Sequence, residues 1–335
     1  MNSKNDKPIL GFWGELPRPF FTIAPMADVT DVAFRQIIAK YSRHGEVGGG
    51  PDVFWTEFVS ADGLMSAGRD VLLRDLAFTN REHPIVAQIF GAHPKHMEEA
   101  AKLVALLGFD GIDINMGCPD KSIEKQGSGA AHIKNPKLAQ EVILATMAGA
   151  QGLPVSVKTR IGYNKENLSE WLPLLLDTKP AVITVHARTR KELSLVPARW
   201  EYVAQAVQIA KGSGTLIIGN GDARDLADGE SKAQATGADG IMFGRALFGT
   251  PWLFDRTRVT PPSLQEKFEI LIEHTHLYEE LLGDIKPFAI MKKHYKAYVN
   301  GFDGAKELRV RLMDARDAKE VESIARTFLV EMGNL

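Results

Sequence analysis

Cys118 is the single cysteine of the chain, and it follows an apolar, strand-like run, between Gly117 and Pro119. A lone cysteine is more often a small core residue than a reactive one. Its place at the end of a predicted strand instead favours partial exposure, which makes its proton available. Because an unperturbed thiol has a pKa of about 8.5, Cys118 stays mostly protonated at neutral pH and can act as a general acid.

Lys158 and His186 lie inside two other apolar runs with the composition of strands. Inert lysines seldom lie inside an apolar strand, so the pattern favours a functional role for Lys158. Such a lysine can form a Schiff base with a carbonyl substrate, or it can stay charged and stabilise an electron-rich ring. The sequence leaves both chemistries open. For His186, a buried imidazole with a satisfied hydrogen bond is the competing interpretation.

Two glycine-containing segments, Gly219-Asn220-Gly221-Asp222 and Gly244-Arg245, end two further strand-like runs. Glycine lets a ligand approach the backbone closely, and an arginine guanidinium pairs with phosphate oxygens. Glycines alone could simply terminate strands. Arg245 beside them favours a phosphate-bearing ligand.

These residues belong to a regular alternation of short strand-like runs and amphipathic helical segments. Several runs are apolar on both faces, which is typical of parallel strands covered by helices. Eight such units over one stretch predict an α/β fold of the (β/α)8 barrel type, also called a TIM barrel, rather than an open sheet with one strand too many assigned. The predicted strands are Phe20–Met26, Val53–Ser60, Pro84–Gly91, Gly111–Gly117, Val155–Ile161, Ala181–Ala187, Thr215–Gly221 and Gly240–Ala246.

A barrel of this type builds its site from the loops that follow the carboxyl ends of its strands. The residue types at those ends should therefore meet at one rim. They are Ala24, Pro25, Met26, Gln88, Asn115, Cys118, Lys158, Arg160, His186, Arg188, Asn220, Asp222, Gly244 and Arg245.

The pattern changes after Pro261-Pro262, where helical periodicity replaces strands. We expect a barrel over residues 1–258 and a small all-helical bundle over residues 259–335, with helices at Leu264–Leu282, Phe288–Asn300, Ala305–Leu312 and Ala318–Glu331. Seven Lys and Arg against two Asp and Glu lie between Lys286 and Arg311, interleaved with Tyr295, Tyr298 and Phe302. Cations mixed with stacking faces are typical of RNA-binding surfaces, although a solvated helix face is the simpler interpretation.

Composition excludes several other classes. The formal net charge is -2, so any nucleic-acid surface must be local. One cysteine rules out an internal disulfide and a multi-cysteine metal site, and the histidine pairs lack a third ligand, so we expect no metal. Neither a secretory signal nor an apolar run of about 18 residues is present. We therefore expect a cytoplasmic protein without a membrane segment, and nothing in the sequence requires more than a monomer.

Taken together, the motifs resemble the flavin-dependent tRNA-dihydrouridine synthases over nearly the whole chain. Five stretches in order carry the resemblance: Asp113-Ile-Asn-Met-Gly-Cys-Pro119 with Gly127-Ser-Gly-Ala130, Val157-Lys-Thr-Arg160, Val185-His-Ala-Arg-Thr189, Asn220-Gly-Asp222, and Gly237-Ala-Asp-Gly-Ile-Met-Phe-Gly-Arg245 with Pro251-Trp-Leu-Phe254. The family usually has glycine where this chain has Ala187 and Ala246.

The resemblance implies FMN in the barrel mouth, NADPH as reductant and tRNA as substrate. It implies that Asn115 and Arg160 face the target uracil. Reduced FMN would give a hydride to C6 of that base, and Cys118 would give a proton to C5. The bundle would hold the RNA, because a base must leave its stack to reach the barrel. The implied FMN contacts are Ala24, Pro25, Met26, Gln88, Lys158, His186, Asn220, Asp222, Gly244 and Arg245, and the expected RNA contacts are Lys286, Lys292, Lys293, Lys296, Arg309 and Arg311.

Three other functions remain to be separated by experiment. One keeps the FMN barrel but reduces or oxidises a free pyrimidine, as dihydroorotate dehydrogenases do; the additional helical region argues against it. A second is a Schiff-base aldolase that uses Lys158. A third is a noncatalytic RNA-binding protein, suggested by the basic helices.

Overall fold

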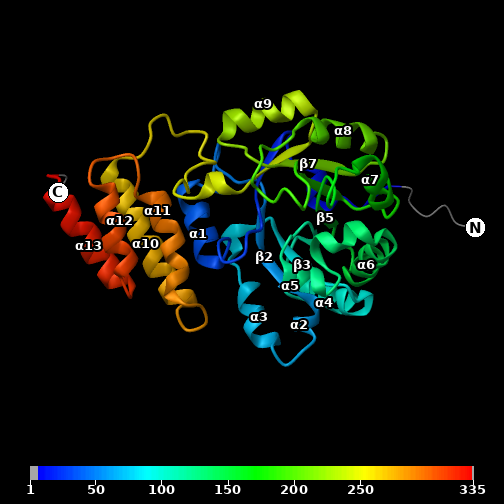
Figure 1. Cartoon of the computed structure of the whole chain (residues 1–335), viewed down its shortest axis with the longest axis horizontal. Helices are drawn as coiled ribbons and strands as arrows, with labels where there is room; N and C mark the ends of the chain where they lie inside the picture. The colour runs from blue at the N-terminus through cyan, green and yellow to red at the C-terminus, as the bar shows by residue number, and fades with distance from the viewer. Residues whose placement is uncertain (1–6, 334–335) are drawn as a thin grey trace, which may run out of the picture.

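A computed structural model describes residues 7–333, which form an eight-stranded parallel barrel followed by a group of helices (Figure 1). Every predicted strand is present within one or a few residues of its expected ends, so the predicted fold class is confirmed. The strands are β1 (Phe20–Ile23), β2 (Phe54–Ser60), β3 (Ile85–Phe90), β4 (Gly111–Met116), β5 (Val155–Arg160), β6 (Val182–His186), β7 (Leu216–Asn220) and β8 (Gly240–Phe243).

The barrel closes through two unequal seams. β1 pairs with β8 along its whole length, from Phe20 opposite Gly240 to Ile23 opposite Phe243. Between β1 and β2, in contrast, an isolated parallel bridge joins Thr22 to Val53, the residue before β2. Each of the other strands pairs in parallel with the strand that follows it, so all carboxyl ends lie at the same rim.

Helices surround the barrel and then form a separate group next to it. Around the barrel lie α1 (Val32–Tyr41), α2 (Ala61–Leu64), α3 (Arg69–Asp75), α4 (Pro94–Leu106), α5 (Lys121–Lys125), α6 (Pro136–Gly149), α7 (Leu168–Leu176), α8 (Glu201–Ala210) and α9 (Leu226–Thr236). The group beside it contains α10 (Leu264–Leu282), α11 (Lys292–Tyr298), α12 (Ala305–Asp314) and α13 (Ala318–Glu331). Short 3-10 helices lie at Gly11–Gly14, Asn80–Glu82, Gly129–Lys134, Arg245–Leu247 and Phe288–Met291.

Local sequence signals explain several helix ends. The Asn135 side chain accepts a hydrogen bond from the backbone N–H of Leu138, and Pro136 occupies the first turn of α6. The Asp225 carboxylate caps α9 in the same way, and Gly237 ends that helix in the left-handed conformation. These caps fix where α6 begins and where α9 begins and ends.

The helical group has its own hydrophobic cluster, which also includes one face of α1. Val32, Ala33 and Ile37 of α1 pack with residues of α10 to α13, and α1 lies between the barrel and the helical group in Figure 1. Residues 288–300 form a 3-10 turn and then α11, instead of the single predicted helix. This helical group, α10 to α13, is called the helical region below.

The structure corrects one expectation about the helical region. Tyr295 and Tyr298 are buried, at 0% and 1% exposure, and Phe302 packs against the same cluster. The helical period of α11 turns the Tyr295 and Tyr298 rings inward while Lys296 between them faces outward. Tyr295 and Tyr298 are therefore core residues and cannot offer stacking faces to RNA.

Within residues 7–333, no helix is long and apolar enough to cross a membrane.

A buried histidine in the helical region makes stability depend on pH. The His294 ring packs 5.2 Å from Phe34 and 5.3 Å from Phe248, and burial lowers its pKa to about 3. An unfolded histidine has a pKa of about 6.5, so between these values the unfolded state binds a proton that the folded state does not, and stability falls as pH falls. Relative to His294→Phe, the wild type should lose up to about 1.4 kcal/mol of unfolding free energy per pH unit below pH 6.5. Urea unfolding of both proteins at pH 7.5, 6.5 and 5.5 measures this difference. If the unfolding free energies of the two proteins changed equally with pH, the prediction would be contradicted.

Candidate active site

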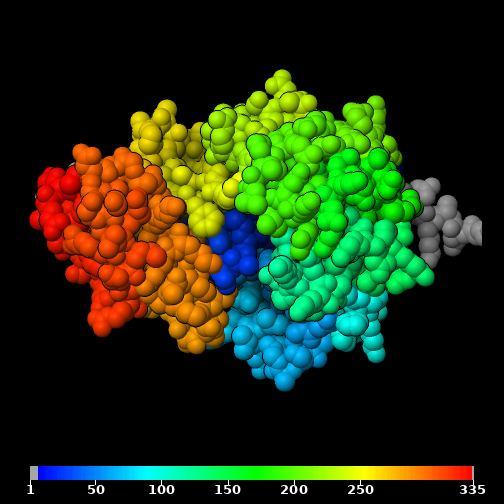
Figure 2. Space-filling model, in the orientation of Figure 1, coloured from blue at the N-terminus to red at the C-terminus, as the bar shows by residue number. Residues whose placement is uncertain are grey.

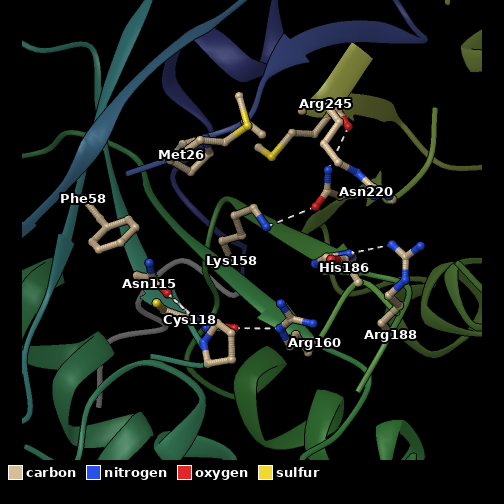
Figure 3. A pocket seen from close by; sticks show the side chains of 18 of the residues that line it. Met26, Phe58, Asn115, Cys118, Lys158, Arg160, His186, Arg188, Asn220 and Arg245 are labelled. Atoms are coloured by element: carbon tan, nitrogen blue, oxygen red, sulfur yellow. Dashed lines mark hydrogen bonds between the residues drawn. The ribbon is translucent and has the colours of Figure 1, made fainter. Parts of the chain in front are cut away.

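A cavity of about 290 Å³ opens at the carboxyl ends of the strands, and all eight strands or the loops after them contribute to it (Figure 3). The structure brings every barrel residue predicted for the site to this one cavity. Those residues are Ala24, Pro25, Met26, Gln88, Asn115, Cys118, Lys158, Arg160, His186, Asn220, Asp222, Gly244 and Arg245.

Cys118 lines the cavity on a loop that Asn115 holds in place. The Asn115 Oδ1 atom accepts hydrogen bonds from the backbone N–H of Gly117 at 3.1 Å and of Cys118 at 2.9 Å. Burial raises the pKa of the Cys118 thiol above its ordinary value. The thiol is therefore protonated at neutral pH, and this arrangement suits a proton donor better than a nucleophile.

A buried chain of hydrogen bonds fixes the orientation of Asn115. Its Nδ2 donates to Oε1 of Gln88 at 3.0 Å, and Nε2 of Gln88 donates to the carboxylate of Asp113 at 2.6 Å. Ser156 donates to the other oxygen of Asp113 at 2.6 Å. Because an ionised carboxylate only accepts hydrogen bonds, Asp113 determines which way each amide points. Asn115 thus shapes the Cys118 loop as well as facing the cavity.

Lys158 lies in the centre of the cavity (Figure 3), and its ammonium donates to Oδ1 of Asn220 at 3.1 Å. Burial and the nearby positive charge of Arg160 lower its pKa to about 8. At neutral pH most of the Lys158 side chains are therefore charged, and the charge is lost as pH rises through 8. The Asn220 amide is itself held, because Nδ2 donates to the carbonyl of Met242 at 2.8 Å.

Arg160 and His186 complete the wall beside Lys158. The Arg160 Nε donates to the carbonyl of Gly117 at 2.7 Å, and Nη1 donates to the carbonyl of Thr189 at 3.1 Å. Burial lowers the pKa of Arg160 to about 10, so it stays charged at neutral pH. His186 is neutral, because burial and the surrounding cations hold its pKa well below the ordinary value.

At the end of the cavity next to β7 and β8, two arginine side chains pair with one carboxylate. Asp222 forms ion pairs with both Arg188 and Arg245, and it accepts the backbone N–H of Ala198 at 2.9 Å. Gly221 has a φ of 128°, and a Cβ there would come within 2.8 Å of Ala198. This glycine is required by the turn itself. Asp222 therefore orients two guanidinium groups, a role that the sequence did not suggest.

Several residues of the cavity lining have no predicted role, among them Arg188, Phe58 and Ser194. The sequence places Arg188 at the rim without a function, and in the structure its guanidinium also lies 3.2 Å from Nε2 of His186. Phe58 on β2 and Ser194 in the β6 loop line the cavity as well. Phe58 is apolar, so the polar character that marks the other strand ends does not point to it. Ser194 lies six residues beyond Arg188, where no strand pattern places it.

The predicted RNA-binding residues separate into two groups. Lys292, Lys293, Lys296 and Arg309 line one groove of about 760 Å³ between α11 and α12, together with Lys306. Val310, 61% exposed, and Met313, 48% exposed, form apolar surface in the same groove.

Lys286 and Arg311 lie outside this groove. The Lys286 side chain is only 14% exposed and pairs with Glu57 at 2.6 Å and Asp75 at 2.9 Å. Arg311 pairs with Glu331 of α13 at 3.2 Å. The structure thus places Lys286 in a contact between the helical region and the barrel, away from the open surface.

No group of three or more His, Cys, Asp or Glu side chains that could hold a metal ion occurs among the described residues.

Comparisons with known proteins agree with the fold and with the motifs. Residues 22–332 match the family model described as "Dihydrouridine synthase (Dus)". A protein named "Probable tRNA-dihydrouridine synthase" from Staphylococcus aureus (strain Mu50) is 38% identical over 327 residues, which cover 96% of each chain. "Probable tRNA-dihydrouridine synthase 2" from Bacillus subtilis (strain 168) is 39% identical over 322 residues, covering 95% of this chain and 96% of the relative.

Solved structures of low identity share the barrel. Histamine dehydrogenase from Rhizobium sp. 4-9 aligns with a TM-score of 0.55 at 13% identity, over 77% of this chain and 48% of that one. A complex of 2-naphthoyl-CoA reductase aligns with a TM-score of 0.54 at 11% identity, over 71% and 49%. This likeness concerns the fold alone. The family model and the relatives go further, and they show that this chain belongs to the dihydrouridine synthase family.

Proposed function

We propose that this protein reduces specific uridines in tRNA to 5,6-dihydrouridine, with FMN as cofactor and NADPH as reductant. Family membership and the names of the relatives support this reaction. The observation that carries the proposal is the cavity itself, in which a protonated thiol, a central lysine and two arginines on one carboxylate lie at one barrel rim. Proton donor, cation and anion-binding end are the groups that such a reduction requires.

The residues present fit FMN by their chemistry. At one end Arg245 and Arg188, with glycines in the turns, suit a phosphate, and Asp222 can accept hydrogen bonds from ribityl hydroxyls. At the other end Lys158, Gln88 and Asn220 offer polar contacts to a ring, and the apolar side chains Ala24, Pro25, Met26 and Met242 offer its surface. The cavity volume is close to the lower end of the roughly 300–1,000 Å³ typical of ligand pockets. When bound and reduced, FMN would supply the hydride that adds to C6 of uracil.

The chain's own residues would carry out the remaining work. Cys118 holds a proton on its Sγ, because its pKa is raised, and would deliver it to C5 of the base. Lys158 would stabilise negative charge on the bound ring with its ammonium. Arg160, with its carbonyl partners around the Cys118 loop, and Asn115 would orient the uracil opposite the thiol.

We further propose that residues 1–258 act as the catalytic unit and residues 259–335 as the tRNA-binding unit of a cytoplasmic monomer. The groove between α11 and α12 supports this assignment, because Lys292, Lys293 and Lys296 project from one helix and Lys306 and Arg309 from the next. Lys286 is not included in this surface.

Incubation of the purified enzyme with NADPH and tRNA that lacks dihydrouridine tests the proposal. The protein should be yellow, and mass spectrometry should find a gain of two hydrogens at defined uridines. Orotate in place of tRNA should give no product. A colourless protein that borohydride traps on Lys158 would instead indicate an aldolase, and wild-type dihydrouridine levels in cells carrying Cys118→Ala would indicate a noncatalytic RNA-binding protein.

The groove should contribute to tRNA affinity and little to turnover. The double variant Lys296→Ala/Lys306→Ala should raise KM for tRNA by about tenfold, leave kcat unchanged and flatten the salt dependence, because each lost phosphate contact reduces the salt slope by about 0.7–0.9. Steady-state kinetics at several salt concentrations measures both effects. Lys319→Ala, an exposed lysine of α13 outside the groove, is the control and should change neither. Equal KM values for the double variant and the wild type would remove the groove from the binding surface.

A further inference from the structure

β2 contains an irregularity next to the cavity. Trp55 pairs with Val86 of β3, but the next paired residue, Phe58, lies opposite Gln88, so Thr56 and Glu57 together face one residue of β3. This two-for-one arrangement is a β-bulge, a feature that re-aims side chains near active sites. Thr56 fills the gap in the ladder, because its hydroxyl donates to the carbonyl of Glu57 at 2.7 Å and accepts the backbone N–H of Gln88 at 3.1 Å.

The bulge gives the two neighbouring side chains different partners. Phe58 lines the cavity, whereas Glu57 bonds to the loop after β1 and to the helical region. One carboxylate oxygen of Glu57 accepts the backbone N–H of Asp28, and the other pairs with the Lys286 ammonium at 2.6 Å. The Glu57 side chain is only 7% exposed, so this pair is shielded from water.

The loop that Glu57 holds, residues 25–31, carries Met26 into the cavity. Asp28 has a φ of 52°, an uncommon conformation for a residue with a side chain. Hydrogen bonds from the barrel part of the chain hold the rest of the loop. The Met26 backbone N–H donates to the Thr30 hydroxyl at 2.9 Å, and the buried Arg35 guanidinium donates to the Thr30 carbonyl at 2.7 Å. The contacts of Asp28 lead instead to the helical region, through Glu57 to Lys286 and through its own carboxylate to Lys293 at 3.4 Å.

We propose that Glu57 and Lys286 are positioning residues that couple the helical region to the cavity loop 25–31, so that the placement of the helical region determines how Met26 borders the site. The inference rests on the proposed function only in that the helical region would be the part that holds tRNA. Lys286 acts through Glu57 and the Asp28 backbone, and is not among the residues that line the cavity. Figure 2 shows the early part of the chain, in blue, at the floor of the hollow between the helical region and the barrel.

A second lysine–glutamate ion pair between the same two parts of the molecule, more exposed than the first, provides a control. Lys40 of α1 pairs with Glu273 of α10 at 2.6 Å, and neither of these residues bonds to the loop 25–31. Lys40→Met therefore removes a lysine–glutamate contact between barrel and helical region without disturbing the loop. Any effect of Lys286→Met that Lys40→Met shares is a general loosening of the contact.

Hydrogen exchange of the full chain, without ligands, is the direct test. In Lys286→Met, amides of the segment 25–31 should exchange about tenfold faster than in the wild type, because the carboxylate that holds the Asp28 amide loses its anchor. Glu57→Gln, which keeps an acceptor but loses the charge, should give a smaller increase, and Lys286→Arg should restore protection. Lys40→Met should exchange like the wild type in this segment. Unchanged exchange in both Lys286→Met and Glu57→Gln would overturn the proposal, as would an equal increase in Lys40→Met.

Titration of the apo-protein with FMN and kinetics with tRNA extend the test. A displaced Met26 should weaken FMN binding by several-fold in Lys286→Met but not in Lys40→Met, and should lower kcat while the salt slope of KM for tRNA stays constant. A lower salt slope with an unchanged exchange rate would make Lys286 an RNA contact, and would overturn the proposal. Absence of dihydrouridine formation by the wild type would defeat the proposed function alone, because the exchange experiment needs neither cofactor nor RNA.

Discussion

Replacing Cys118 with serine should lower kcat for tRNA reduction by about 10²–10⁴, the range that a lost general acid typically costs. The thiol lies in the cavity with its proton retained, because burial raises its pKa. A serine hydroxyl keeps nearly the same shape but is a much weaker acid, so proton delivery to C5 should become rate-limiting. Single-turnover oxidation of reduced enzyme by tRNA, followed through the flavin absorbance, measures this step separately from reduction by NADPH.

The reductive half-reaction serves as the internal control for Cys118→Ser. Reduction of the enzyme by NADPH, FMN affinity and the melting temperature should stay close to wild-type values, because the Cys118 backbone keeps its bond to Asn115. Undiminished tRNA-dependent oxidation would remove Cys118 from the reaction. Loss of both half-reactions would show that the substitution damages the cavity as a whole.

Lys158→Met should lower kcat by about 10²–10³, the loss typical of removing one electrostatic stabiliser from an active site. The wild-type rate should also fall as pH rises above about 8, because the Lys158 ammonium, whose pKa burial lowers to about 8, is then lost. The Cys118 thiol titrates at higher pH, since its pKa is raised. In Lys158→Met the alkaline fall near pH 8 should therefore disappear, which a pH–rate profile of reduced-enzyme oxidation measures.

Lys158→Arg separates charge from position. Arginine keeps a positive charge at all relevant pH values, so this variant should retain more activity than Lys158→Met and should also lack the fall near pH 8. Lys158→Met should fold as well as the wild type or better, because the buried ammonium that it removes is held at a cost that lowers its pKa. An alkaline limb that persists near pH 8 in Lys158→Met would show that another group titrates there.

The barrel and the members of its site could be predicted from the sequence because both depend on local rules. Apolar runs of strand length recur eight times, and parallel strands place all their carboxyl ends at one rim. Cys118, Lys158 and Arg245 therefore meet at one cavity although they are far apart in the chain. Caps such as Asn135 and Asp225 are local signals of the same kind.

In the helical region, local rules predict helices but not which of their side chains are buried. The sequence predicts α10, α12 and α13 within two residues and α11 only as part of a longer helix, and it does not show which face of α11 meets a partner. Tyr295 and Tyr298 turned out to be core residues, and Lys286 turned out to be a buried partner of Glu57. Which side of a short helix is buried is decided only when another element packs against it. In the helical region, α1 of the barrel supplies part of that packing surface.

By itself the sequence determined the order of the strands and helices, the residue types at the rim and the family, because these follow from periodicity and short-range motifs. Only the tertiary structure decided the hydrogen-bond chain from Asp113 to Cys118, the pairing of two arginines with Asp222 and the bulge that directs Glu57 to the helical region. Each of these joins side chains that are separated along the chain, or depends on strand register. Their energies arise from burial and mutual orientation, which no local pattern specifies.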